Sequence, residues 1–317
     1  MFLCVSPNPA IDKRITLPAL VPGEIHRAQT VRAFPGGKST HVAMVLKALG
    51  AKPHWIGLCG GSTGSALLAG LDHLGIKAHV CSSAAETRTN LEIIDDAGVV
   101  TEIRERGESV SGAELAAFER ACNAWFQKGR EDAVVIFSGS LPVGAPPEFY
   151  AALIAAARKA GCRTFLDTSG EPLKLALASH PHFVKPNRDE AAGLLNSAIT
   201  SRDAAVKALS QFFSRGTCSV ALSLGAEGLL YASGKSEPIL FAPAIPLAAK
   251  STVGCGDAAV AGFAYAAASG SPPEDTLRTA AACAAANCLA DSPGEVRKET
   301  IDKFQSQVRI ESFKSGP

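Results

Sequence analysis

The sequence has no long hydrophobic run, no block of basic residues and no Cys-x-x-Cys pair. None of its uninterrupted apolar runs approaches the ~18 residues that a membrane span needs, and Pro7 and Pro9 interrupt the stretch where a signal peptide would lie. The 31 basic and 30 acidic residues nearly cancel, which argues against nucleic-acid or anionic-membrane binding. The nine cysteines are odd in number and scattered, as thiols in a reducing compartment are. We therefore expect a cytoplasmic protein with small-molecule partners, no nucleic acid and no membrane.

The length of 317 residues suffices for one large core with a small excursion. Short apolar strands alternate with helical stretches, which predicts a single α/β domain over residues 1–317 whose mostly parallel sheet is covered on both faces. Residues 13–34 lack a helical period, and residues 87–106 contain a hairpin that no helix follows. We expect these two segments to form a small β lid that excludes water from a site. The exposed edges of such a lid would allow a homodimer.

The stretch from Lys250 to Phe263, KSTVGCGDAAVAGF, is typical of a loop that opens a helix. The first N–H groups of a helix have no intrahelical partner, so the amides of Gly254, Cys255 and Gly256 could bind an anion such as a phosphate. Asp257 follows them directly. Taken alone, this acid is explained as well by an ordinary helix start, where aspartate is a common cap or first-turn residue.

Two better-known phosphate motifs do not fit the chain. The spacing of Gly254, Gly256 and Ala259 satisfies the dinucleotide fingerprint, but the helical pattern that follows never returns to a strand. The Gly-Lys-Ser at 37–39 resembles the end of a Walker A loop, but Arg32 stands where that loop needs a glycine. A helix N-terminus beside a carboxylate remains, and this suits phosphoryl transfer to a hydroxyl: amides stabilise the moving phosphoryl group and the acid takes the hydroxyl proton.

STVGCGDAAVAGF closely resembles the second signature of the ribokinase-like (PfkB) carbohydrate kinases. The resemblance implies a ribokinase-like three-layer α/β/α sandwich with a small β-sheet lid. It also implies that Asp257 is the catalytic base, with Gly254, Cys255 and Gly256 as the anion hole.

The resemblance extends to the substrate side of the site. NPAID at 8–12 and GGK at 36–38 are similar to sugar-contacting motifs of the family, whereas ETRTN at 86–90 and SGSLP at 138–142 resemble its phosphosugar branch. In that branch the arginine and the serine hold the phosphate already on the substrate. Ser39 replaces a family glycine, and His41 replaces the asparagine that usually contacts sugar hydroxyls. The substrate-binding residues implied in this way are Asp12, Gly36, Gly37, Lys38, His41, Arg88 and Ser140. Without the resemblance, Asp12 and Arg88 are also explained as ordinary surface residues, and Ser140 as part of a serine-rich turn.

The nucleotide side is implied by a KPN-x-x-E motif and by two later segments. Lys185 would contact nucleotide phosphates, and Asn187 and Glu190 would hold Mg²⁺ through waters. The spacing of three is also that of a helix cap. The SLGAEG turn would border the nucleotide or form a plain hairpin. The resemblance also implies that Asn287 lies near an adenine pocket and near a loop that binds a monovalent cation such as K⁺. These further nucleotide-binding residues are Ser223, Gly225, Gly228 and Asn287.

Together these features predict an ATP- and Mg²⁺-dependent kinase of a ketohexose phosphate. The implied branch contains 1-phosphofructokinases and tagatose-6-phosphate kinases, so the candidate substrates are fructose 1-phosphate, tagatose 6-phosphate and fructose 6-phosphate. A kinase of an unphosphorylated sugar or nucleoside is an alternative. A second alternative is a sugar-phosphate-binding regulator with weak catalysis, which Ser39 and His41 keep open.

Overall fold

A ten-stranded sheet forms the centre of the computed structural model, which describes residues 1–129 and 133–313. Neighbouring strands from β5 to β11 run parallel, and those from β11 to β14 run antiparallel. The strands, in their order across the sheet, are β14 (Glu311–Phe313), β13 (Ile239–Pro243), β12 (Gly228–Ala232), β11 (Ser219–Ser223), β10 (Phe183–Val184), β9 (Arg163–Asp167), β8 (Val134–Ser138), β1 (Phe2–Ser6), β4 (Pro53–Cys59) and β5 (Lys77–Ser82).

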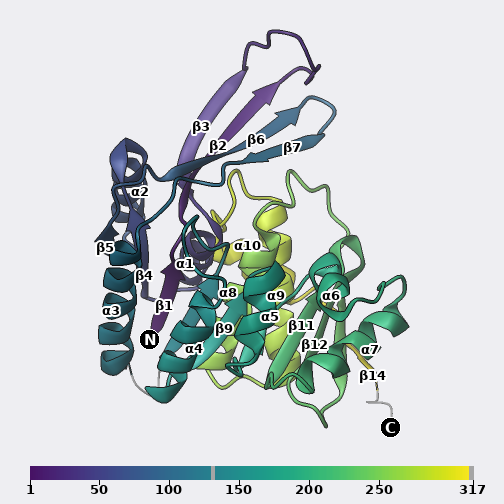
Figure 1. Cartoon of the computed structure of the whole chain (residues 1–317). Coiled ribbons are helices and arrows are strands. Elements are labelled where there is room, and N and C mark those ends of the chain that lie inside the picture. Colours follow the sequence, from purple (N-terminus) through teal and green to yellow (C-terminus); the bar gives the residue numbers. More distant parts are fainter. Residues whose placement is uncertain (130–132, 314–317) are drawn as a thin grey trace.

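Helices cover both faces of this sheet (Figure 1). Strand side chains alternate between the two faces, so Cys4 of β1 belongs to one core cluster while Leu3 and Val5 belong to the other. The first cluster packs under α1 (Lys38–Ala48), α2 (Gly61–His73), α8 (Cys255–Ala268), α9 (Pro273–Cys288) and α10 (Lys298–Gln305). The second packs under α3 (Gly112–Gly129), α4 (Phe149–Lys159), α5 (Gly170–Leu177), α6 (Arg188–Leu195) and α7 (Arg202–Phe213). The predicted three-layer α/β/α sandwich with a mostly parallel sheet is confirmed.

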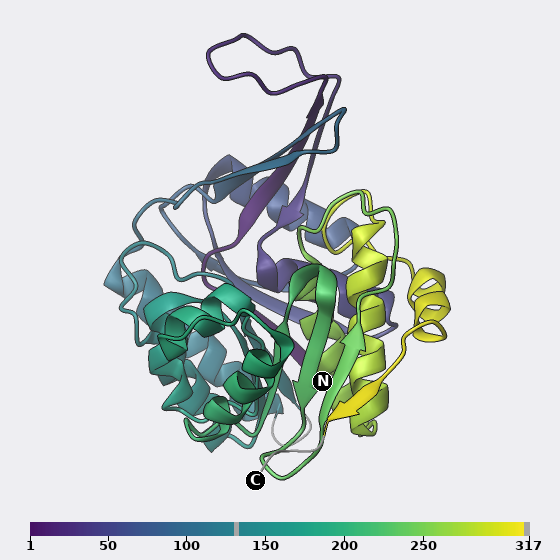
Figure 2. The ribbon, with the colours of Figure 1, turned by 90° about the vertical axis from the view of Figure 1, so that its right-hand side faces the viewer.

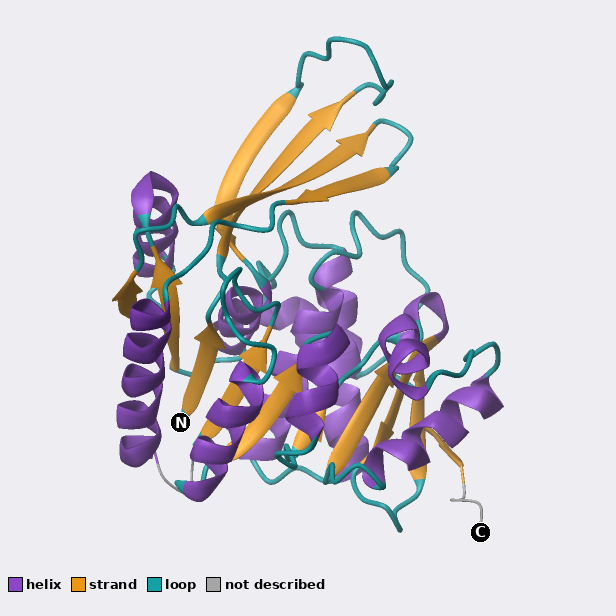
Figure 3. Ribbon diagram, in the orientation of Figure 1, coloured by secondary structure: helices purple, strands orange, loops and turns teal. Residues whose placement is uncertain are grey.

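A second, four-stranded sheet stands over the carboxyl ends of the central strands (Figures 1 and 3). Its order is β3 (Thr30–Gly36), β2 (Ala10–Leu17), β6 (Arg88–Asp95) and β7 (Val100–Arg104). Both segments expected to leave the main sheet contribute strands, but β2 begins already at Ala10, directly after the turn that follows β1. We call this four-stranded sheet the lid. Figure 2 shows the loop between β2 and β3 at its far tip.

Two hydrogen bonds tie a buried ion pair of the lid to the body of the protein. Arg14 of β2 donates to both carboxylate oxygens of Glu92 on β6, at 2.8 and 3.0 Å, and both side chains are more than nine-tenths buried. From the body, the hydroxyl of Ser251 donates to Glu92 at 2.6 Å, and the carbonyl of Asp291 accepts from Arg14. Because a buried charge is costly without partners, these bonds favour the position in which the lid lies over the strand ends.

The cysteines are free thiols, and five of the nine are buried in apolar surroundings. Burial raises the pKa of Cys283 to about 12, so this thiol stays protonated and behaves as a small apolar side chain. Within residues 1–129 and 133–313, no helix is both long enough and apolar enough to span a bilayer.

Candidate active site

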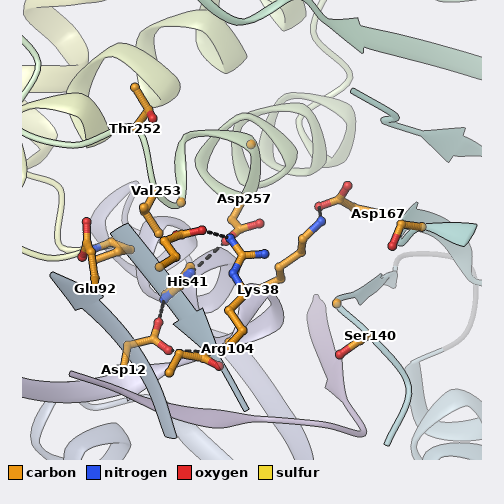
Figure 4. A pocket seen from close by; sticks show the side chains of 18 of the residues that line it. Asp12, Lys38, His41, Glu92, Arg104, Ser140, Asp167, Thr252, Val253 and Asp257 are labelled. Atoms are coloured by element: carbon orange, nitrogen blue, oxygen red, sulfur yellow. Dashed lines mark hydrogen bonds and ion pairs between the residues drawn. The ribbon is translucent and has the colours of Figure 1, made fainter. Parts of the chain in front are cut away.

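The main cavity, of about 700 Å³, lies between the lid and the carboxyl ends of the central strands. This is where ligands gather in parallel α/β sheets. The predicted residues that line it are Asp12, Gly37, Lys38, His41, Arg88, Ser140, Lys185, Asn187, Glu190, Ser223, Gly254, Gly256 and Asp257. Figure 4 shows side chains from the lid, α1 and α8 converging on this space.

Asp257 lies in the first turn of α8, at the wall of the cavity. The turn begins at Gly254, whose φ of 80° is in the left-handed region. A Cβ atom at Gly254 would lie 2.7 Å from the Cβ of Pro293, so the position has room for glycine only. Within the described residues, no backbone or side-chain acceptor takes the N–H groups of Gly254, Gly256 or Asp257. These three amides are free to bind an anion.

Cys255 differs from the prediction that placed it in the anion hole. Its N–H donates to the carbonyl of Thr252 at 3.2 Å, and its sulfur lies 3.1 Å from the sulfur of Cys288, away from the cavity. Of the four successive N–H groups from Gly254 to Asp257, only that of Cys255 is hydrogen-bonded within the described residues. Of the three expected donors in the described chain, Gly254 and Gly256 have free N–H groups and Cys255 does not, whereas the N–H of Asp257 is also free.

His41 joins the two carboxylates at the centre of the cavity (Figure 4). Its Nδ1 lies 2.8 Å from Oδ2 of Asp257, and its Nε2 lies 2.8 Å from Oδ2 of Asp12. Burial alone would lower the pKa of His41, but the bonds to both carboxylates raise it to about 10. Burial likewise opposes the ionised form of Asp12, yet the bonds from His41, Asn90 and the Gly37 amide bring the pKa of this carboxyl below its usual value. Both ring nitrogens are thus used within the protein, whereas the resemblance implied a contact with the sugar.

Two small residues of the GGKS stretch at 36–39 contribute to the packing around the Asp12–His41–Asp257 bridge. A Cβ atom at Gly36 would lie 2.2 Å from Cγ of Asp12, so this glycine leaves space for the carboxylate although it does not line the cavity. Ser39 stands where the family has glycine, and its buried hydroxyl bonds to the carbonyls of Val5 at 2.5 Å and Ser138 at 2.8 Å. The serine therefore ties α1 to the ends of two central strands and does not obstruct the site.

Asp167 is a functional candidate that the sequence did not single out. It is the last residue of β9, it is 1% exposed, and it lies 3.3 Å from Nζ of Lys38 and 3.4 Å from Nζ of Lys185. Burial opposes its charge, but the two ammonium groups lower the pKa of Asp167. The pKa of Lys38 is raised in turn by Asp167, Asp257 and Glu190, against the effect of burial. The only sequence signal was a carboxylate at the carboxyl end of a buried strand.

Lys185 places a positive charge at the mouth of α8. A Cβ atom at Gly256 would lie 3.2 Å from the Lys185 ammonium, so this group stands directly beside the free amides. An ammonium group and a helix N-terminus at one point make a strong anion site.

Arg88 and Ser140 lie in the wall of the same cavity. Arg88 donates to the carbonyls of Glu105 at 2.9 Å and Asn8 at 3.2 Å, while its buried Nε has no partner among the described residues. The hydroxyl of Ser140 accepts from the side-chain amide of Asn8 at 3.0 Å. Arg104, from lid strand β7, adds a second guanidinium to this wall. Three groups that suit a phosphate are therefore present on this side.

Asn187 and Glu190 form the helix cap that their spacing allows. The Asn187 side chain accepts from the Glu190 N–H at 2.8 Å, and Oε2 of Glu190 accepts from the Asn187 N–H at 2.8 Å. Both residues also line the cavity. Oε1 of Glu190 takes no hydrogen bond from the described residues, so it can face a hydrated Mg²⁺. Among the described residues, no group of three or more His, Cys, Asp or Glu side chains is arranged to hold a metal ion directly.

Three other predicted residues lie outside the cavity lining, whereas Ser223 is part of it. Asn287 donates to the Val253 carbonyl at 2.7 Å and accepts from the Gly294 N–H at 2.8 Å, so it braces the loop before α8. Gly225 and Gly228 both have positive φ and shape the turn between β11 and β12.

Comparison with known proteins identifies the chemistry of this cavity. The model of the pfkB family carbohydrate kinases matches residues 8–300. The chain belongs to this family. It is 36% identical over 269 residues to a 1-phosphofructokinase of Xanthomonas campestris pv. campestris, which covers 83% of each chain. It is 35% identical over 279 residues to a 1-phosphofructokinase of Rhodobacter capsulatus, with coverage of 88% of this chain and 87% of the relative.

A solved pfkB-type structure confirms the ribokinase-like fold of this carbohydrate kinase. Phosphofructokinase-2 from Escherichia coli, crystallised in complex with substrates and products, matches with a TM-score of 0.89 at 28% identity, over 97% of this chain and 98% of that one. The reaction of this pfkB kinase is therefore ATP-dependent phosphoryl transfer to a carbohydrate hydroxyl, for which the family implies Mg²⁺.

Proposed function

We propose that this kinase transfers the γ-phosphoryl group of ATP to a hydroxyl of a ketohexose phosphate, and that Asp257 is the general base. The observation that carries the proposal is the position of Asp257, which stands beside three free amides in one cavity with Asp12 and Arg88. The names of the curated relatives favour fructose 1-phosphate among the three candidate substrates.

Each residue of the site has a distinct task in this reaction. Asp257 accepts the proton of the attacking hydroxyl, for which its Oδ1 is free of other bonds within the described chain. The amides of Gly254 and Gly256 stabilise the charge on the transferring phosphoryl group. Asp12 accepts hydrogen bonds from sugar hydroxyls, and Arg88 binds the phosphate that the sugar already carries.

Other residues that line the cavity are assigned to the nucleotide. Lys185 and the turn at Ser223 face the nucleotide, with the ammonium group on its phosphates. Asn187 and Glu190 hold Mg²⁺ through waters, and the ion, when bound, neutralises phosphate charge. We also propose that K⁺ binds near the loop that Asn287 braces. A structure of Escherichia coli phosphofructokinase-2 in complex with potassium supports this.

The lid completes the proposed organisation. We place the described residues 1–129 and 133–313 in one cytoplasmic domain, whose lid is the sheet of β2, β3, β6 and β7. Two lids can associate into a homodimer through apolar side chains such as Ile25, Val31 and Val99, which are 96%, 53% and 57% exposed.

A screen of ADP release tests the substrate assignment. The substrates are fructose 1-phosphate, fructose 6-phosphate, tagatose 6-phosphate and their unphosphorylated parents, with ATP and Mg²⁺. We expect turnover with a ketohexose phosphate, and fructose 1-phosphate as the best substrate. Turnover of an unphosphorylated sugar, with a Michaelis constant that Arg88→Ala leaves unchanged, would replace this assignment. Calorimetric binding of a sugar phosphate without ADP release would instead identify a regulator.

A further inference from the structure

His41 is almost enclosed by the site and touches both of its central acids. It lies in the first turn of α1, and its side chain is 5% exposed. Asp257 reaches it from α8 and Asp12 from β2, each with one carboxylate oxygen 2.8 Å from a different ring nitrogen (Figure 4). The ring therefore joins two elements that are far apart in the sequence.

A count of hydrogens shows what this geometry requires. An ionised carboxylate only accepts hydrogen bonds, and a neutral imidazole has a single N–H to donate. Two ionised carboxylates at 2.8 Å can both be satisfied only by an imidazolium, which donates from both nitrogens. Two cations interact with the acids of this unit: Lys38 on α1 with Asp257, and Arg88 on β6 with Asp12. These two cations offset the net single negative charge of the three-residue unit. The other charged side chains that line the cavity are Glu92, Glu102 and Arg104 of the lid, and Asp167, Lys185 and Glu190 of the body.

We propose that His41 is a positioning residue, whose imidazolium locks Asp257 and Asp12 into one hydrogen-bonded unit and so aims the base at the sugar hydroxyl. The inference rests on the proposed role of Asp257. With Oδ2 of Asp257 held by His41, Oδ1 is the oxygen left to receive the proton. Asp12 is fixed in the same way, because its Oδ2 bonds to His41 and its Oδ1 accepts from the Asn90 amide at 2.8 Å.

This role differs from the sugar contact that the family pattern implied at this position. An almost buried ring with both nitrogens occupied has no donor left for a substrate. It acts on the reaction through the two acids. The proton shared with Asp257 stays on the imidazole throughout, so the hydroxyl proton ends on Asp257 and no proton passes through His41.

The protonation state can be measured on the unaltered enzyme by ¹⁵N NMR of its histidines. We expect both nitrogens of His41 to carry protons at pH 8 and to lose one as the pH rises through about 10. A His41 signal that is neutral at pH 8, or that titrates near the ordinary value of about 6.5, would overturn the proposal. This measurement does not depend on turnover.

The effect on catalysis is measured as a pH profile of ADP release with fructose 1-phosphate, for the parent, His41→Gln and His41→Asn. The turnover number of the parent should fall as the pH rises through about 10, where the imidazolium is lost. Both variants should lose this alkaline fall and turn over about 10- to 100-fold more slowly at pH 8, as expected for a misaligned base. An unchanged profile in both variants would overturn the proposal.

Two further variants separate the possible failures. His73→Gln replaces an exposed histidine of α2 and should leave the rate and the profile unchanged. Asp257→Asn tests the proposed function itself: if it is fully active, that function fails. If it is inactive while both His41 variants keep the parent profile, only the positioning role fails.

Discussion

The replacement of Gly254 by alanine would strain the loop that presents the free amides. A residue with a Cβ atom at a φ of 80° costs roughly 1–2 kcal/mol. The new Cβ would stand 2.7 Å from Pro293, and overpacking of this kind costs about 1–3 kcal/mol more. We therefore expect Gly254→Ala to lower the free energy of unfolding by about 2–5 kcal/mol, or to relieve part of that strain by moving the loop.

Loop movement would displace the amides from the transferring phosphoryl group. The loss of one such donor lowers turnover about 100- to 1,000-fold, and we expect Gly254→Ala to fall in that range in the ADP-release assay. Urea denaturation measures the stability change in parallel.

Two matched variants separate the causes. Gly270 lies just after the C-terminal end of α8, with a φ of 66° and open space where a Cβ atom would be. Gly270→Ala should therefore lower the free energy of unfolding by about 1 kcal/mol and leave the turnover number unchanged. Cys255→Ala should keep turnover within about threefold, since that side chain faces Cys288. Our reasoning would be refuted if Gly254→Ala were as stable as Gly270→Ala and as active as the parent.

Three other substitutions test separate parts of the site. Arg88→Ala should raise the Michaelis constant for fructose 1-phosphate about 10- to 100-fold. Arg32→Ala, on an exposed part of the lid, should leave that constant unchanged. If the two variants had equal Michaelis constants, Arg88 would not belong to the phosphate site. Glu190→Gln can still cap α6, so its effect would concern the metal alone. We expect the Mg²⁺ concentration needed for half-maximal rate to rise about tenfold. An unchanged Mg²⁺ requirement would contradict the magnesium assignment. Glu92→Gln breaks the buried lid contact and should lower the free energy of unfolding by about 3–5 kcal/mol, whereas Glu171→Gln, in an exposed ion pair, should change it by at most about 1 kcal/mol.

The elements that the sequence predicted well are those in which local pattern and tertiary role agree. The alternation of apolar strands with helical stretches predicted the layered sheet, because strands buried on both faces have few other arrangements. The glycine-rich start of α8 predicted free amides beside an acid. Residues Gly254 and Asp257 meet this expectation in a stretch of four residues, where chain geometry alone controls the outcome.

The features that sequence reasoning missed depend on contacts between distant segments. Asp167 acquires its partners only where β9, α1 and the end of β10 meet, and nothing near it in the chain indicates two lysines. His41 suggested a changed sugar contact, because its distance from Asp12 and Asp257 is set by the tertiary fold. The Cys255 amide was misplaced for a local reason, since a turn that bonds one amide back to Thr252 leaves no trace in the residue types.

The most direct test of the account is the turnover of Asp257→Asn with fructose 1-phosphate, ATP and Mg²⁺. Asparagine keeps the size of the side chain but cannot accept the hydroxyl proton, so we expect turnover to fall about 100- to 10,000-fold. Asp189→Asn, which changes an exposed acid in the first turn of α6, serves as the matched control and should stay fully active. An Asp257→Asn enzyme that releases ADP as fast as the parent would contradict the assignment of Asp257 as the base.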